Sequence, residues 1–270
     1  MRHFIRNSLL SLAYFHPAAL RVLLRSGPGA TANYLKEIYR CSKIDAGLHL
    51  PIVAVEELAH STSEFKIHRP SNLDGSMTIT EIASLCNLIA ARCPKKILEI
   101  GSFQGLTTLN MAMNAPAAEI HTLDLPEEFE PGETLFDNND AGTISRRGFY
   151  YYKDRPEARI IHQHYGDTAT FDFSVIGAGV DLCLIDAAHS YDYVKNDTKK
   201  SLSLMADDSL LLWHDYGRND FMAEPQDAWG VTRFLHEIAG AGVGILQGTS
   251  LGVLRITNKS RKALSTILET

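Results

Sequence analysis

The sequence predicts an α/β protein: a doubly wound, mostly parallel sheet of seven strands, with an antiparallel hairpin near its C-terminus and a helical extension at its N-terminus. From residue 76 onwards, short apolar runs alternate with helical patterns, which is typical of parallel strands covered by helices on both faces. The last two apolar runs flank a glycine-containing turn and therefore predict the hairpin. Of the 270 residues, 45% are hydrophobic and 21% are charged, as in globular domains.

Residues 1–75 differ from the rest of the chain, because they show short helical patterns but no predicted strand. Helices are predicted at 31–40 and 53–60, and the breaker Ser-Gly-Pro-Gly at 26–29 separates the first helical stretch from the next. We expect this extension to act as a lid or as the contact of a homodimer. Residues 76–270 are expected to form the domain that carries the chemistry.

The predicted domain opens with a helix whose start and end are both marked in the sequence. Thr78 and Glu81 form a capping box, and Pro94 follows the last residue at helical spacing. Apolar runs and helical spacing assign the remaining elements in the same way. Strands are predicted at 97–100, 120–123, 158–163, 180–185 and 209–213, with the hairpin at 244–247 and 251–256. Helices are predicted at 105–114, 191–205 and 228–239.

Charge, apolar runs and cysteines exclude several classes of protein. The net charge of −6 and the lack of a long basic run argue against a nucleic-acid partner. No run approaches the roughly 18 apolar residues of a membrane span. The cysteines form no CxxC pair and lie in apolar patterns, so we expect buried thiols in a cytoplasmic protein. These cysteines are Cys41, Cys86, Cys93 and Cys183.

The residues that follow the first two strands predict a nucleoside site. Gly101 and Gly105 lie between the first strand and the next helix, where glycine permits a tight turn and a close approach of a ligand. Asp124 ends the second strand, and a carboxylate at this edge of a sheet accepts hydrogen bonds from ribose hydroxyls. An adenosine-type ligand is therefore expected across the carboxyl ends of these two strands.

The segment from Glu99 to Gly105, together with Asp124, resembles the first motifs of the class I S-adenosylmethionine-dependent methyltransferases. It has two glycines where nucleotide oxidoreductases usually show GxGxxG, and S-adenosylmethionine has no pyrophosphate that needs a helix N-terminus. The resemblance implies a Rossmann-like fold and methyl transfer from S-adenosylmethionine. It implies cofactor contacts from Glu99, Gly101, Ser102, Gly105, Asp124, Leu125, Asp167 and Asp186.

Two later segments resemble one subgroup of that family, the small-molecule O-methyltransferases. They are residues 184–191 (LIDAAHSY) after the fourth strand and 211–216 (LLWHDY) after the fifth. Members of the subgroup often have glycine where this chain has Ala187. The resemblance implies O-methylation of a small hydroxylated metabolite or sugar.

O-methylation needs a base that takes the proton of the acceptor hydroxyl. A histidine suits this role near neutral pH. His214 is the first candidate for the base and His189 the second. Asp186 and Asp215 are expected beside them, facing the acceptor. Catechol-type enzymes that these segments resemble instead bind Mg²⁺ with an Asp after the fourth strand and an Asp-Asn pair after the fifth. A Mg²⁺ or Mn²⁺ site at Asp186 and Asp215 is therefore the alternative, although His214 weakens the case for Mg²⁺, which prefers oxygen ligands.

Two other functions stay open from the sequence. A nicotinamide-dependent oxidoreductase would share the fold and the use of Asp124, and a non-catalytic protein would bind the cofactor without turnover. The long connection 126–157 matches no motif, and its aromatic residues at 149–152 either line the acceptor site or pack an inserted helix. His162 and His164 have no third metal ligand nearby in sequence, which argues against a zinc site.

Overall fold

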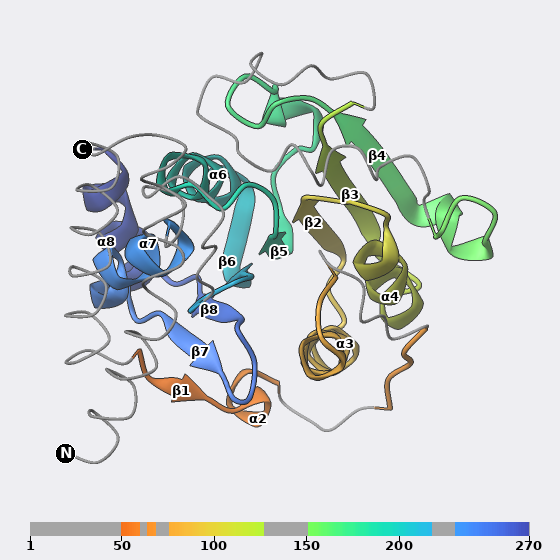
Figure 1. Cartoon of the computed structure of the whole chain (residues 1–270), viewed down its shortest axis with the longest axis horizontal. Helices are drawn as coiled ribbons and strands as arrows, with labels where there is room; N and C mark the ends of the chain where they lie inside the picture. Colours follow the sequence, from red (N-terminus) through yellow and green to blue (C-terminus); the bar gives the residue numbers. More distant parts are fainter. Residues whose placement is uncertain (1–49, 60–63, 69–75, 127–150, 218–229, 270) are drawn as a thin grey trace, which may run out of the picture.

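The computed structural model describes residues 50–59, 64–68, 76–126, 151–217 and 230–269. They form one eight-stranded sheet with the strand order β1-β7-β8-β6-β5-β2-β3-β4 (Figure 1). The predicted helix at 31–40 and most of the 126–157 connection lie outside the described residues. Within the described residues, no helix is long and apolar enough to cross a membrane.

The sheet confirms the predicted doubly wound topology. Strands β2 to β6 pair in parallel, and β8 pairs antiparallel with both β6 and β7, as the predicted hairpin requires. One further strand, β1, joins the edge of the sheet in parallel with β7. The strands are β1 Ile52–Val53, β2 Lys96–Ile100, β3 Glu119–Asp124, β4 Ile161–Tyr165, β5 Val180–Ile185, β6 Met205–Trp213, β7 Gly244–Leu246 and β8 Gly252–Arg255.

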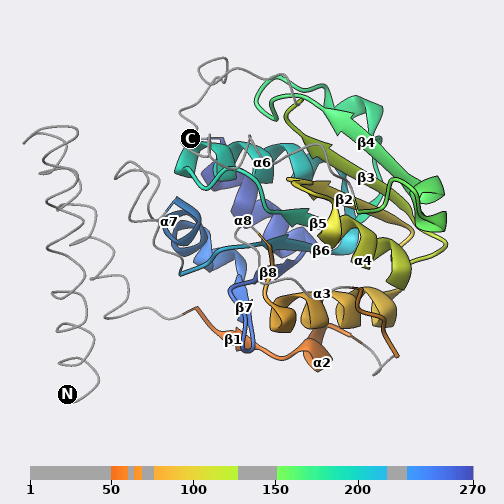
Figure 2. The same ribbon diagram turned by 45° about the vertical axis from the view of Figure 1, so that its right-hand side comes forward.

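Helices cover both faces of the sheet. Helices α3 and α4 lie on one face, and α6, α7 and α8 lie on the other (Figure 1, Figure 2). Leu85 and Ile97 belong to the core under α3, whereas Trp213 and Phe234 belong to the core under α6 and α7. The helices are α2 Val55–Leu58, α3 Ile79–Arg92, α4 Leu106–Asn114, α6 Tyr191–Leu204, α7 Gly230–Glu237 and α8 Asn258–Leu268.

The structure corrects three details of the sequence prediction. Residues Pro156–Ile160 form a 3-10 helix, so the strand expected from 158 begins at Ile161; proline at the first position of a helical turn favours that turn. The predicted helix at 53–60 is shortened to α2, because Val53 pairs with the sheet. Cys93 is exposed, because it ends α3 in a left-handed conformation with φ +49° at the surface.

The predicted capping box at the start of α3 is present. Thr78 Oγ1 accepts a hydrogen bond from the Glu81 backbone N–H, and the Glu81 carboxylate accepts one from the Thr78 N–H at 2.8 Å. The Glu81 side chain is buried, so the same carboxylate is also turned towards the interior of the domain.

The order of strands reverses between β2 and β5, and the loops that follow these two strands touch each other. In such sheets, ligands bind outside the carboxyl ends of the strands at this reversal point. Gly101 follows β2 with φ +99°, and a Cβ atom added to it would lie 1.9 Å from the carbonyl oxygen of Asp186, which follows β5. The backbone here therefore requires glycine, both for its conformation and for its space.

Candidate active site

The loop between β2 and α4 is a tight turn at the reversal point. The Gly101 N–H donates to the Leu123 carbonyl at 2.8 Å, and the Gly105 N–H donates to the Ser102 carbonyl at 2.7 Å. Gly105 precedes α4 with φ +75°. The backbone of this turn is thereby fixed at the carboxyl edge of the sheet, close to the end of β3.

The structure brings Asp124 to this loop, as the sequence predicts. Its two carboxylate oxygens accept the backbone N–H groups of Phe103 and Leu125, each at 2.7 Å. The Gly166 N–H donates to the Asp124 carbonyl at 2.9 Å, which brings Asp167 to the same edge. Asp167 is buried and accepts the Tyr193 hydroxyl at 3.0 Å.

Glu99 lies behind the glycine turn. It is fully buried, and its Oε2 accepts the hydroxyls of Thr108 and Thr122. Burial raises the pKa of Glu99 to about 8, with the nearby carboxylates of Asp186 and Asp124 adding to the shift. Its Oε1 has no hydrogen-bond partner among the described residues. Because buried polar atoms are usually paired, this oxygen marks a place for a water molecule or a polar atom of a ligand.

Four polar residues that follow β5 and β6 meet beside the same edge. His214 Nδ1 lies 2.9 Å from Asp186 Oδ1 and 3.4 Å from Asp215 Oδ2. His189 Nε2 lies 2.7 Å from Asp215 Oδ2. All four predicted acceptor-side residues therefore form one group, in which each histidine faces carboxylates.

His214 is held between carboxylates through both ring nitrogens. Its Nε2 lies 3.3 Å from Glu81 Oε2, opposite the side that faces Asp186, and only 9% of the residue is exposed. Burial alone would lower the pKa of His214, but Asp186, Asp215 and Glu81 outweigh it and hold the pKa well above its usual value. The surrounding carboxylates therefore favour the protonated form of His214.

The pair of His189 and Asp215 is more open. The His189 side chain is 23% exposed, against 10% for His214. Burial would raise the pKa of Asp215, but its hydrogen bonds with His189 and His214 hold that pKa far below the usual range. Asp215 therefore stays a carboxylate at the side of the His189 ring.

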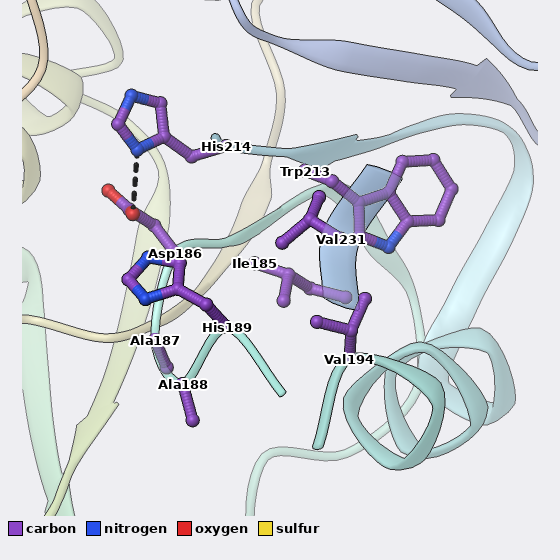
Figure 3. A pocket seen from close by; sticks show the side chains of 9 residues that line it. All are labelled: Ile185, Asp186, Ala187, Ala188, His189, Val194, Trp213, His214 and Val231. Carbon is purple, nitrogen blue, oxygen red and sulfur yellow. Dashed lines mark hydrogen bonds and ion pairs between the residues drawn. The ribbon is translucent and has the colours of Figure 1, made fainter. Parts of the chain in front are cut away.

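A small pocket lies beside this group. Figure 3 shows Asp186, His189 and His214 together on one side and apolar side chains on the other. The pocket is lined by Ile185, Asp186, Ala187, Ala188, His189, Val194, Trp213, His214 and Val231.

The predicted metal ligands, Asp186 and Asp215, lie close enough to share an ion with His189. One ligand atom from each of the three residues lies within 4.8 Å of the others. Two carboxylates and an imidazole suit a cation such as Mn²⁺ better than Mg²⁺, which favours oxygen ligands alone. The residues present therefore fit a divalent cation, and a protonated His214 would compete with that cation for the same two carboxylates.

Glu81 is a site residue that sequence reasoning missed. The capping box explained its presence at the start of α3, so no signal pointed to a second role. In the fold, its carboxylate also reaches His214 and accepts the Ser250 hydroxyl at 2.6 Å. Contacts between such distant positions of the chain leave no local pattern.

A second histidine group lies on β3 and β4. His121 Nδ1 lies 2.9 Å from His164 Nε2, and the His121 ring stacks on the rings of both His164 and His162. His121, on the adjacent strand β3, is thus the third imidazole of this group. Burial lowers the pKa of both His121 and His164.

Comparisons with known proteins found a matching family model and similar solved structures. Residues 98–216 match the family model of a methyltransferase domain. The chain is similar to a Staphylococcus aureus protein assigned as a caffeoyl-CoA O-methyltransferase, with 15% identity, a TM-score of 0.50, and coverage of 83% of this chain and 100% of that one. It is also similar to the O-methyltransferase TomG of Streptomyces achromogenes, with 19% identity, a TM-score of 0.48, and coverage of 80% and 95%.

The matched region begins inside β2 and ends just after β6. It includes the glycine turn, Asp124, Asp167 and the histidine-carboxylate group, so the sequence match and the described site coincide. The nicotinamide-dependent oxidoreductase considered from the sequence is thereby set aside. Residues 98–216 of this chain belong to a class I S-adenosylmethionine-dependent methyltransferase domain.

Proposed function

We propose that this methyltransferase transfers the methyl group to a hydroxyl oxygen of a small molecule. The observation that carries the proposal is the position of the His189–Asp215 pair. It lies in the loops that follow β5 and β6, beside Asp186, whose backbone touches the glycine turn at Gly101. In this position His189 would be a proton acceptor next to the proposed cofactor site, as O-methylation requires.

The cofactor is proposed to lie across the carboxyl ends of β2 and β3. The Gly101–Gly105 turn would face its methionine portion, and Asp124 would bind the ribose hydroxyls, with Leu125 beside them. Asp167, at the end of the next strand, would face the adenine. The unpartnered Oε1 of Glu99 supports this placement, since it gives the site a buried polar atom behind Ser102 and the turn.

His189 is the proposed base in this reaction. The acceptor oxygen attacks the methyl carbon in line with the sulfur; the O–C bond forms, the C–S bond breaks, and the hydroxyl proton passes to His189. Asp215 orients the His189 ring and stabilises the imidazolium that forms. We place His189 ahead of His214 for this role because both ring nitrogens of His214 face carboxylates and its side chain is more deeply buried than that of His189.

His214 would then supply a fixed positive charge beside Asp186 and Asp215. A divalent cation held by Asp186, His189 and Asp215 is the competing arrangement, and it would supply a Lewis acid that lowers the pKa of the acceptor hydroxyl. In both arrangements Asp186 and Asp215 would hold a positive charge, either His214 or the cation, next to the acceptor hydroxyl.

Two measurements test the proposed function. Titration calorimetry with S-adenosylhomocysteine should show binding to the purified chain, and NADH should not bind. Formation of S-adenosylhomocysteine from S-adenosylmethionine should then be followed with a panel of catechols, flavonoids and sugars, and at least one hydroxylated compound should be methylated at oxygen. Binding without turnover on any acceptor would instead identify a non-catalytic cofactor-binding protein, and methylation at nitrogen or carbon would also contradict the proposal.

A further inference from the structure

The turn that contains His214 and Asp215 has an unfavourable backbone conformation, which contacts with the rest of the protein must stabilise. Asp215 has φ +64°, in the left-handed region that residues other than glycine rarely adopt. Such a residue keeps its conformation only when the surrounding structure holds it. The backbone on its two sides is tied down: the His214 N–H donates to the Ile185 carbonyl, and the Tyr216 N–H donates to the Ser250 carbonyl, both at 3.0 Å.

Glu81 is connected to both ends of this turn. On one side, its Oε2 lies 3.3 Å from Nε2 of His214, the residue before Asp215. On the other side, its Oε1 accepts the Ser250 N–H at 3.0 Å and the Ser250 hydroxyl at 2.6 Å. Ser250 lies in the β7–β8 connection and is the residue whose carbonyl holds Tyr216.

The Glu81 carboxylate is also rigid and well shielded. It is 5% exposed and is fixed at its own helix start by Thr78, whose N–H and hydroxyl both donate to Oε2 at 2.8 Å. Burial would raise the pKa of Glu81, but hydrogen bonds from His214, Ser250 and Thr78 lower it well below the usual range. The Glu81 carboxylate is therefore held in one position by its hydrogen bonds.

We propose that Glu81 is a positioning residue for methyl transfer: it clamps the His214–Tyr216 turn from both sides and so keeps Asp215 in place against His189. The inference rests on the proposed function. Glu81 touches neither the cofactor edge nor His189 in the structure, and it acts through the His214 ring and through Ser250. Groups that orient a catalytic residue through one intermediate side chain commonly change activity by about 10–100-fold when removed.

The test compares two changes in the same helical turn. Glu81→Gln keeps the size of the side chain but removes its charge and replaces one of its two acceptor oxygens. Thr78→Ala removes the capping hydroxyl and leaves the carboxylate that faces His214. We expect Glu81→Gln to lower kcat by about 10–100-fold while the Kd for S-adenosylhomocysteine stays within threefold. Thr78→Ala should lower the melting temperature and reduce kcat less than Glu81→Gln does, because Glu81 keeps its charge and its hydrogen bonds from the Thr78 N–H and from Ser250.

Two further variants keep the outcome clear. Glu81→Asp retains the charge and should recover part of the lost kcat. Ser250→Ala removes the hydroxyl that donates to Glu81 but keeps the Ser250 N–H, so it should give a smaller loss than Glu81→Gln. All rates are measured well below each variant's melting temperature. Wild-type kcat in Glu81→Gln, or an equal loss of kcat in Thr78→Ala, would overturn the proposal. If Glu81→Gln does not fold, Ser250→Ala with unchanged kcat would overturn it. An inactive wild-type chain would instead contradict the proposed function.

Discussion

His189 Nε2 lies 2.7 Å from Asp215 Oδ2, so the loop after β5 and the loop after β6 are joined by a charged hydrogen bond. Neither residue occupies a regular element. Their approach depends on the parallel pairing of β5 with β6, which ends both strands at the same edge. The pair therefore places an imidazole ring, held by a carboxylate, at this edge of the sheet.

Removing the His189 imidazole should abolish most of the methyl transfer. We expect His189→Ala to lower kcat by about 10²–10⁴-fold, because the acceptor hydroxyl loses its base. The affinity for S-adenosylhomocysteine should stay within a few fold, since His189 lies on the acceptor side. His162→Ala is the matched control: it removes a half-exposed imidazole from β4 and should leave kcat unchanged. Equal loss in both variants would remove His189 from the mechanism.

Treatment with a chelator distinguishes a mechanism that uses a protonated His214 from one that uses a bound metal ion. With His214 supplying the positive charge beside Asp186 and Asp215, activity should survive exhaustive dialysis against EDTA. The rate is measured before and after dialysis, and again after addition of Mn²⁺ or Mg²⁺. Complete inactivation that either ion reverses would show that a cation held by Asp186, His189 and Asp215 is required instead.

Asp124 should govern cofactor affinity. Asp124→Ala removes two charge-assisted hydrogen bonds to the ribose, each worth about 1.5–3 kcal/mol before water compensates, so calorimetry with S-adenosylhomocysteine should show at least about a tenfold weaker Kd. Because the same carboxylate accepts the N–H groups of Phe103 and Leu125, the melting temperature should fall as well. Asp124→Asn, which keeps one acceptor oxygen, should lie between wild type and alanine. An unchanged Kd in Asp124→Ala would take this residue out of the site.

The histidines on β3 and β4 should make the fold sensitive to acid. Burial lowers the pKa of His121 and His164 in the fold, so the unfolded chain binds more protons than the folded chain once the pH falls through about 6.5. Their contribution to stability is therefore present above that pH and is lost below it. The melting temperature of His121→Gln should fall less between pH 7.5 and pH 5.5 than that of wild type. An identical fall in both proteins would contradict this reading.

Much of the fold is visible in the sequence because the central strands are buried on both faces. The predicted bounds of β5, 180–185, match the structure, since a continuous apolar run between turns leaves little choice. Strand β1 has only two residues and is defined by its pairing with β7, so no local pattern marks it. No helix was predicted at α8, although the sequence there contains a helix cap at Thr257 and apolar residues at helical spacing, Leu264 and Leu268.

The sequence indicated which residues meet at the site but not how they are arranged. Strand ends predicted that Asp186, His189, His214 and Asp215 would gather, and they do. Their ranking as proton acceptors depends on burial and on the neighbours of each ring nitrogen. Those include Glu81, which arrives from a helix on one face of the sheet and could not be paired with His214 from spacing alone.

The contact between Gly101 and the Asp186 carbonyl has a consequence for how such an enzyme can change over time. The distance between the glycine turn after β2 and the loop after β5 is set by two main chains in contact, not by side chains that mutation exchanges. Substitutions of the side chains that line the pocket can therefore change its shape without moving the two loops apart. New acceptor preferences are open to this scaffold, whereas position 101 itself has no freedom to vary.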